Sequence, residues 1–289
     1  MSQYSSKWIR VSEPYPHVLH VELARAPVNA FNTELWQAYG KLFDQLVEDS
    51  YDVRALVVSS SFSKTFTAGI DLNDLAGPEI IATDKVSDNA RGALQTRKRL
   101  LAFQRALGAP ERTPFPVILA VHGHVIGLGV GLIGACDVCY AASNTSFIIK
   151  EVDVGFAPGL GTMAFLPKIT GNHSLVRELT YTARPFSAAE AERLGLVSKV
   201  VQGGREEVIK EALELARVIA SRSPVAVAGA KHLTTHARDY SVPENLAVTS
   251  VWNGSAFLTN DIPDNLKARL NKQSPSFPPL AVIPRQSKL

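Results

Sequence analysis

Residues 121–161 read VHGHVIGLGVGLIGACDVCYAASNTSFIIKEVDVGFAPGLG. The stretch combines a glycine-rich turn, a short uncharged helical segment, two expected strands and a second glycine turn. Glu151 follows a mostly apolar run that is rich in β-branched residues, so we expect it at the end of a buried strand. A carboxylate in that place is either a structural buried acid or part of a functional site.

The composition favours a globular protein that acts on small molecules. The chain has 289 residues, enough for one large α/β domain with a substantial core. Charged residues make up 20% and the net charge is +3, which is too small to predict a nucleic-acid partner. Uncharged runs end before the roughly 18 apolar residues that a membrane-spanning helix needs, and the N-terminus has no signal-peptide pattern. We therefore expect neither a membrane span nor secretion.

The order of the expected elements predicts an α/β fold. Strands are predicted at 8–12, 17–23, 53–60 and 115–121, and helices at 35–47 and 90–107, the first of them capped by Asn32. Residues 174–258 carry mainly helical patterns, including a capping box that starts at Ser187. We expect a crossover α/β core followed by a helical C-terminal third.

Gly129, Gly131 and Gly134 match the G-x-G-x-x-G pattern of dinucleotide-binding folds. The helix they start can run only to about Ala135, which is too short for the crossover of such a unit. The glycines then either allow close packing of helix on strand or form a backbone cradle for an anionic oxygen.

Cys136 and Cys139 form a C-x-x-C pattern within an expected strand. Residues three apart on a strand point to opposite faces, so we interpret both as structural thiols rather than a redox or zinc pair.

Two histidine patterns also have simpler explanations. His232 and His236 have the spacing of a zinc-binding helix, but Leu233 stands where a catalytic glutamate would be, so we expect no metal. His122 and His124 flank a glycine with no serine elbow nearby, which argues against a Ser-His-Asp triad.

Two glycine turns, at 67–69 and 127–129, each follow a buried apolar strand. A parallel sheet would bring their amides to one edge, where two converging N–H groups form an oxyanion hole. Such a hole opposite the Glu151 carboxylate suits a reaction that passes through an enolate, in which the acid takes and returns an α-proton.

Several segments resemble the enoyl-CoA hydratase/isomerase (crotonase) superfamily over nearly the whole chain, and within it the Δ3,5-Δ2,4-dienoyl-CoA isomerases. They include FTAGIDLNDL (66–75), the run from residue 111 to 142, FIIKEVDVGFAPGLGT (147–162) and SPVAVAGAKHL (223–233). The resemblance implies a crotonase-like α/β spiral of ββα repeats at 1–200, a helical trimerisation region at 201–272 and a proline-rich tail at 273–289. It also implies a homotrimer or hexamer and an acyl-CoA substrate, with no separate cofactor.

The resemblance also implies roles for individual residues. Glu151 falls on a catalytic acid, and the amides of Ala68 and Leu128 on the oxyanion hole. The other implied substrate contacts are Ala30, near the nucleotide end of coenzyme A, and Gly69, Asp71 and Gly127.

Gly131 and Gly159 depart from the family pattern, because the dienoyl-CoA isomerases carry an aspartate at each of these positions. Glu151 alone suits a short C2-to-C4 proton transfer, as in a Δ3-Δ2-enoyl-CoA isomerase, and Asp153 is the nearest candidate for an auxiliary acid. The dienoyl-CoA isomerase activity remains the leading prediction. A single-acid isomerase or hydratase and a weakly active acyl-CoA-binding paralogue remain alternatives.

Ser287, Lys288 and Leu289 spell the S-K-L address for peroxisomal import. We expect recognition by the peroxisomal import receptor and a peroxisomal location.

Overall fold

Two β-sheets form the centre of the fold in the computed structural model, which describes residues 1–49, 51–77 and 88–280. The larger sheet has the strand order β1 (Ile9–Tyr15), β2 (Val18–Leu23), β3 (Ala55–Ser60), β5 (Val117–Val121), β7 (Val138–Ala142) and β10 (Lys199–Val201). The smaller has the order β4 (Thr65–Thr67), β6 (His124–Ile126), β8 (Ser146–Ile148) and β9 (Phe186–Ser187). Neighbours pair in parallel except β1 with β2 and β8 with β9, so the predicted α/β class is confirmed and the first two strands form a hairpin.

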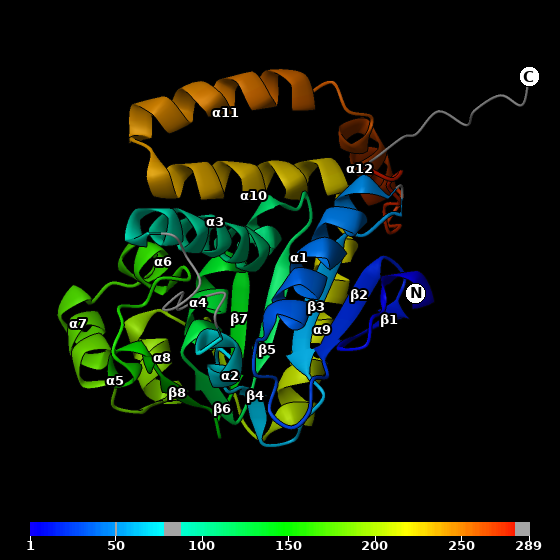
Figure 1. Ribbon diagram of the computed structural model, residues 1–289. Coiled ribbons are helices and arrows are strands. Elements are labelled where there is room, and N and C mark those ends of the chain that lie inside the picture. Colours follow the sequence, from blue (N-terminus) through cyan, green and yellow to red (C-terminus); the bar gives the residue numbers. More distant parts are fainter. Residues whose placement is uncertain (50, 78–87, 281–289) are drawn as a thin grey trace, which may run out of the picture.

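Helices cover the sheets and form a separate layer at one end (Figure 1). They are α1 (Thr33–Glu48), α2 (Leu72–Leu75), α3 (Asn89–Leu107), α4 (Leu128–Ala135), α5 (Glu151–Val154), α6 (Thr162–Ile169), α7 (His173–Thr182), α8 (Ala188–Leu194), α9 (Arg205–Ala220), α10 (Pro224–Asp239), α11 (Val242–Ala256) and α12 (Asp261–Leu270). Asn32 caps α1 as predicted, because its side chain accepts a hydrogen bond from the amide of Leu35.

The larger sheet is buried on both faces, which explains its continuous apolar strands. In β3, Leu56 and Val58 face the core cluster that includes α1, whereas Ala55 and Val57 face a second cluster that includes α9. Since α9 packs on the sheet, the core continues beyond the predicted boundary at residue 200. In Figure 1, α10, α11 and α12 lie at one end of the molecule, apart from both sheets, and α10 packs against α11.

The chain passes three times from the larger sheet to the smaller one and then into a helix. These passages are β3–β4–α2, β5–β6–α4 and β7–β8–α5. The repeated ββα spiral is therefore confirmed. Because β4, β6 and β8 are parallel neighbours, their carboxyl ends and the first residues of α2, α4 and α5 meet at one edge.

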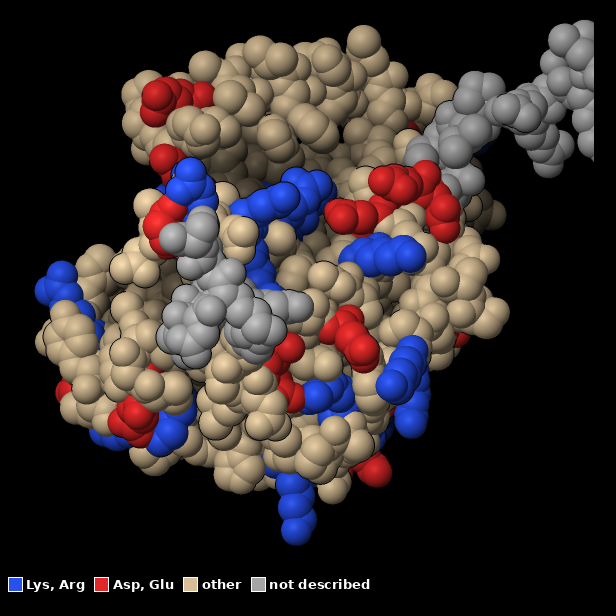
Figure 2. All heavy atoms as spheres, in the orientation of Figure 1, with Lys and Arg blue, Asp and Glu red and all other residues tan. Residues whose placement is uncertain are grey.

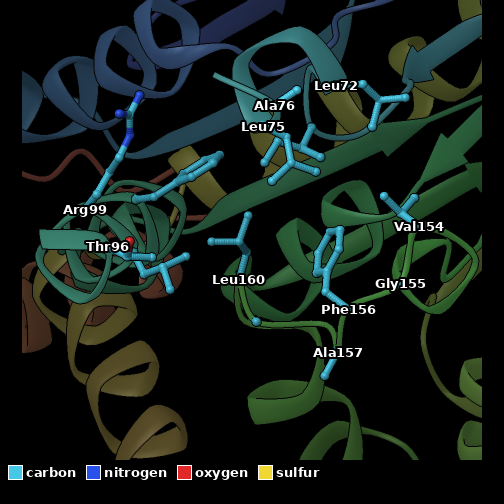
Figure 3. A pocket seen from close by; sticks show the side chains of 14 residues that line it. Leu72, Leu75, Ala76, Thr96, Arg99, Val154, Gly155, Phe156, Ala157 and Leu160 are labelled. Carbon is cyan, nitrogen blue, oxygen red and sulfur yellow. The ribbon is translucent and has the colours of Figure 1, made fainter. Parts of the chain in front are cut away.

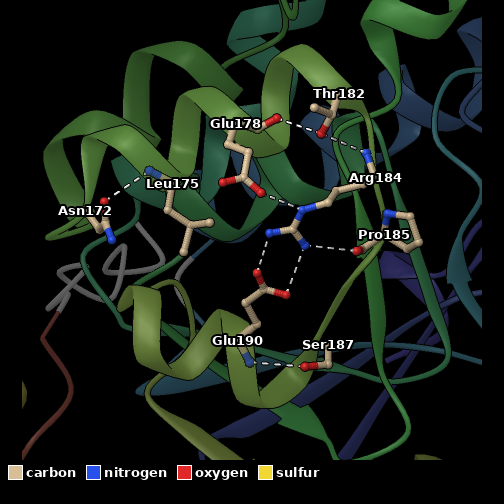
Figure 4. A network of polar contacts seen from close by, with 8 residues as sticks. All are labelled: Asn172, Leu175, Glu178, Thr182, Arg184, Pro185, Ser187 and Glu190. Atoms are coloured by element: carbon tan, nitrogen blue, oxygen red, sulfur yellow. Dashed lines mark hydrogen bonds and ion pairs between the residues drawn. The ribbon is translucent and has the colours of Figure 1, made fainter.

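The side of the smaller sheet is braced by a polar network between α7 and α8 (Figure 4). Arg184 contacts Oε1 of Glu178 at 2.8 Å and Oε1 of Glu190 at 2.6 Å. Ser187 accepts a hydrogen bond from the amide of Glu190 at 3.2 Å, which confirms the predicted helix start. The network fixes the two helices relative to β9.

Lys231 connects α10 to the core. Its Nζ donates to the carbonyl oxygens of Pro110 and Phe115, to Oγ1 of Thr113 and to Oδ2 of Asp137, all between 2.7 and 2.9 Å. A buried lysine needs such a set of acceptors. The layer of α10 and α11 therefore has a fixed attachment beside the start of β5.

Candidate active site

A cavity of about 270 Å³ lies where the three ββα passages meet. Residues of the turns after β4, β6 and β8 line it, together with part of the 154–160 segment. The parallel pairing that sequence analysis expected for the two glycine turns is confirmed, since Thr67 of β4 stands opposite Val125 of β6. The geometry gathers one acid and several backbone amides from distant parts of the chain.

Glu151 is the acidic side chain among the described residues of this cavity. The residue is 7% exposed and Oε2 has no hydrogen-bond partner. Burial raises the pKa of Glu151 above its usual value, and hydrogen bonds from backbone amides oppose the rise. A carboxyl whose pKa is moved towards neutrality suits proton transfer in both directions.

The predicted burial of Glu151 is confirmed, but its predicted position on a strand is wrong. Strand β8 ends at Ile148, and Lys150 takes a helical conformation that turns the chain out of the sheet. Glu151 begins α5, a single turn that ends at Gly155 in the left-handed region with φ 100°.

The N-terminus of α4 places backbone donors beside this carboxyl. Gly127 precedes the helix with φ 55°, a conformation that favours glycine. A carbon atom added to Gly127 would lie 3.6 Å from Oε1 of Glu151, so the carboxyl lies against this turn. The amide of Leu128 has no acceptor in the described part of the chain. Because the first amides of a helix carry partial positive charge, they can stabilise an oxyanion.

Ala68 does not supply the second donor that the sequence predicts. Its amide donates to the carbonyl oxygen of Val28 at 2.9 Å. Beside it, Oγ1 of Thr67 donates to the carbonyl oxygen of Asn29 at 2.6 Å. The segment before α1 therefore runs alongside residues 67–71 and already uses the Ala68 amide. The structure contradicts the prediction for Ala68, because an amide bonded inside the protein is not available to a substrate.

Ile70 offers a free amide two residues further on. The carbonyl oxygen of Gly69 accepts from the amide of Phe31 at 2.8 Å, and the amide of Asp71 donates to the carbonyl oxygen of Phe31 at 3.0 Å. In such a parallel bridge the middle residue points its own amide away from the partner strand. No described residue accepts from Ile70, which lines the cavity together with Leu128. The available pair of amides is therefore Ile70 and Leu128.

Asn29 fixes the segment beside Ile70, a role that the sequence analysis did not identify. It is fully buried with φ 50°. Its Nδ2 donates to the carbonyl oxygens of Leu23 and Phe66 and to Oγ of Ser60, and its Oδ1 accepts from the amide of Arg25. The sequence offers only a weak signal, namely that asparagine tolerates positive φ in turns.

The other predicted substrate contacts divide into two groups. Gly69 and Gly127 line the cavity. Asp71 instead caps α2 and forms an ion pair with Arg25 at 2.7 Å, and Ala30 accepts a hydrogen bond from Arg25 at 2.7 Å. Ala30 and Asp71 thus lie beside the site rather than in its lining.

Asp153 does not join Glu151. It pairs with Lys150, its side chain is 47% exposed, and it is outside the cavity lining. A regular strand would have put both acids on one face, but residues two apart on a helix point in different directions. The candidate auxiliary acid is therefore not brought to the site.

Gly131 and Gly159 lie in different surroundings. A carbon atom added at Gly131 would meet Oγ1 of Thr162 at 2.9 Å and the carbonyl oxygen of Leu160 at 3.3 Å. The same addition at Gly159 would meet only the carbonyl oxygen of Ala157, at 3.7 Å. Gly159 borders the cavity that holds Glu151, whereas Gly131 lies in α4 against α6 and borders only a neighbouring cavity of about 540 Å³.

The remaining reactive side chains found in the sequence are structural. His232 packs near Trp252 and His236 stacks on Tyr240. Cys136 and Cys139 are free thiols. Within the described residues no group of three histidine, cysteine or acidic side chains could hold a metal ion. Over the same part of the chain, every helix is too short or too polar to cross a bilayer.

An apolar cavity of about 630 Å³ adjoins the site (Figure 3). Leucine side chains of α2, residues of α3 and the 154–160 segment surround it, with Phe156 and Leu160 pointing into the space and Arg99 at one edge. An acid and free amides beside an apolar chamber can bind a thioester carbonyl and its hydrocarbon chain.

A family model described as enoyl-CoA hydratase/isomerase matches residues 13–278. The chain belongs to this family. The expected enzyme class and crotonase fold are confirmed. A crystal structure of an enoyl-CoA hydratase from Bacillus anthracis superposes with a TM-score of 0.83 at 28% identity and covers 94% of this chain and 99% of that one.

Relatives of high similarity carry the name Δ3,5-Δ2,4-dienoyl-CoA isomerase. The mitochondrial protein of Mus musculus is 41% identical over 94% of this chain and 82% of its own length. The mitochondrial protein of Homo sapiens is 43% identical over 92% and 80%. The peroxisomal protein of Arabidopsis thaliana is 36% identical over 90% and 92%.

Proposed function

We propose that this chain moves a carbon–carbon double bond within an acyl-CoA through a thioester enolate. The observation that carries the proposal is the buried Glu151 carboxyl beside the free amide of Leu128. In this reaction the thioester oxygen accepts hydrogen bonds from Ile70 and Leu128, and Glu151 removes a proton from C2. The negative charge spreads onto the oxygen and the conjugated carbons, and Glu151 returns the proton further along the chain.

The substrate class follows from two observations. Similarity to proteins named Δ3,5-Δ2,4-dienoyl-CoA isomerase supports a 3,5-dienoyl-CoA, in which the proton returns to C6. A single acid in the described cavity lining supports a 3-enoyl-CoA as second candidate, since the proton then travels only from C2 to C4. Either reaction moves a proton without changing the oxidation state, so coenzyme A as part of the substrate is enough.

Glu151→Gln tests the proton transfer. Loss of a positioned acid–base group typically costs 10²–10⁴-fold in rate, so kcat on 3-enoyl-CoA and 3,5-dienoyl-CoA should fall by about that factor. Asp153→Asn is the matched control, because Asp153 is exposed and outside the cavity. Equal activity of both variants would rule out Glu151 as the proton carrier. Tight binding of acyl-CoA by the wild type without turnover would favour the acyl-CoA-binding paralogue.

We also propose a homotrimer or a hexamer built from trimers. Helix α11 contains no buried residue and exposes Val242, Leu246 and Val251, and the surface over it carries few charged side chains (Figure 2). An apolar face of this kind on a soluble enzyme indicates a protein contact. Light scattering of the full chain should give three or six protomers, and a stable monomer would contradict this.

The peroxisomal location rests on Ser287-Lys288-Leu289, which lie outside the described residues, and on the peroxisomal relative from Arabidopsis thaliana. A fluorescent protein fused before residue 1 should enter peroxisomes, and removal of residues 287–289 should leave it in the cytosol.

A further inference from the structure

The cavity that holds Glu151 lies directly against the larger apolar cavity. Their volumes are about 270 and 630 Å³. Both are lined by Ile70, Leu72, Val154, Phe156, Gly159 and Leu160. These six residues form the boundary between the two cavities, so a group bound at the acid has the larger cavity next to it.

The larger cavity is suited to hydrocarbon. Leu75, Leu100 and Phe103 contribute apolar surface, and they come from α2 and α3. The guanidinium of Arg99 at its edge donates to Oγ1 of Thr33 at 2.7 Å, so this charge is bound within the protein. Together the two cavities measure about 900 Å³, which lies within the range of about 300–1,000 Å³ for pockets that bury a drug-sized ligand, so they have room for more than a short acyl group.

Gly159 stands at the junction of the two cavities and also borders a third of about 540 Å³. Its carbonyl oxygen accepts a hydrogen bond from Nε2 of Gln104 at 2.7 Å, which fixes the backbone to α3. A carbon atom added at this glycine meets one atom within 4 Å, the carbonyl oxygen of Ala157. Any side chain at residue 159 would therefore occupy space that is open in this chain.

We infer that Gly159 determines the acyl-group specificity, and that the site takes acyl-CoAs with a medium or long apolar chain beyond the reacting carbons. This inference rests on the proposed function, because it assumes that the thioester lies beside Glu151. The missing side chain keeps the passage between the two cavities wide. A large side chain there closes the passage and leaves the smaller cavity able to hold only a short acyl group.

The effect on binding is measurable without turnover. Saturated acyl-CoAs from butyryl to dodecanoyl bind but cannot isomerise, and isothermal calorimetry gives their dissociation constants. For the wild type, each methylene buried in the larger cavity should lower Kd by up to about fourfold. In Gly159→Leu this gain should disappear beyond butyryl, while the Kd of butyryl-CoA changes by about twofold or less.

Gly171→Leu is the matched control. A carbon added at Gly171 has no atom within 4 Å, so a side chain fits there as it does at Gly159, but Gly171 lies between α6 and α7, outside the three cavities. It should keep the wild-type dependence on chain length, and thermal unfolding of both variants checks the fold. Gly159→Ala provides a smaller side chain if the leucine variant does not fold, and should give an intermediate slope.

Three results would overturn the inference. They are a wild-type Kd that does not fall with chain length, an unchanged slope in Gly159→Leu, and an equal weakening of all chain lengths in that variant. A dependence on chain length that is present in the wild type and lost in Gly159→Leu, combined with no turnover of any unsaturated acyl-CoA, would contradict the proposed function but keep the inference about Gly159.

Discussion

A second carboxylate at residue 159 is expected to increase turnover of 3,5-dienoyl-CoA, whereas one at residue 131 is expected to destabilise the fold. Gly159 borders the cavity that holds Glu151, and an added carbon there has only one neighbour, at 3.7 Å. Gly159→Asp should therefore change the free energy of unfolding by only about 0.5 kcal/mol, as at an ordinary surface position. The new carboxyl can donate a proton to C6, the end of the diene that is farther from the thioester. A positioned acid contributes about 10²-fold or more to a proton transfer.

Gly131→Asp meets a packed environment. The added carbon would lie 2.9 Å from Oγ1 and 3.2 Å from the amide nitrogen of Thr162, and 3.3 Å from the carbonyl oxygen of Leu160. Overpacking of this kind costs about 1–3 kcal/mol, and a carboxylate beside a carbonyl oxygen adds a further penalty. The urea midpoint of this variant should fall clearly below that of Gly159→Asp.

The assay follows the absorbance of the 2,4-dienoyl-CoA product for the wild type, Gly159→Asp and the isosteric control Gly159→Asn. A nearby negative charge raises the pKa of Glu151 further, so the rate profile of the aspartate variant should also shift to higher pH. Equal rates and equal pH profiles for Gly159→Asp and Gly159→Asn would show that a carboxyl at residue 159 takes no part in the proton transfer. A Gly131→Asp variant as stable as the wild type would contradict the overpacking expected at residue 131.

Three further predictions concern single contacts. Burial raises the pKa of Glu151, so the folded state loses stability as pH rises through that pKa. Glu151→Gln lacks this loss, so its urea midpoint should be higher than that of the wild type at alkaline pH. The two midpoints should converge at acidic pH, where the Glu151 carboxyl is protonated. Leu128→Pro removes the first amide of α4, where proline is tolerated, and its kcat should fall about 10²-fold below that of Leu128→Ala; equal rates would exclude this donor. Lys231→Met leaves Asp137 without its cation and should lower the free energy of unfolding by about 3–5 kcal/mol, and Lys231→Met with Asp137→Asn should recover part of it.

The sequence was sufficient for the elements whose patterns are local. The apolar stripe after Asn32 predicts α1, and the continuous apolar runs predict β3 and β5 because strands buried on both faces need no polar alternation. The glycines at 69 and 127 also marked the turns that supply amides to the cavity. In each case the signal lies within a few neighbouring residues.

The conformation of Glu151 and the choice of oxyanion donors could not be predicted this way. A four-residue helix such as α5 is too short to show a period, so Glu151 and Asp153 seemed to share a strand face. Which amide is free depends on the segment before α1. A carbonyl oxygen of this segment accepts a hydrogen bond from the amide of Ala68, whereas none accepts from the amide of Ile70. That segment is about forty residues away in the chain.

The family, the α/β spiral and Glu151 as the candidate acid could be predicted from the sequence, because these follow from local patterns and shared motifs. Only the folded chain shows that the amide of Ile70 is free, that Asp153 pairs with Lys150 outside the cavity, and that an added side chain has more room at Gly159 than at Gly131. The physical reason is that hydrogen-bond availability and free space are properties of atoms brought together by folding. No single segment of the chain contains them.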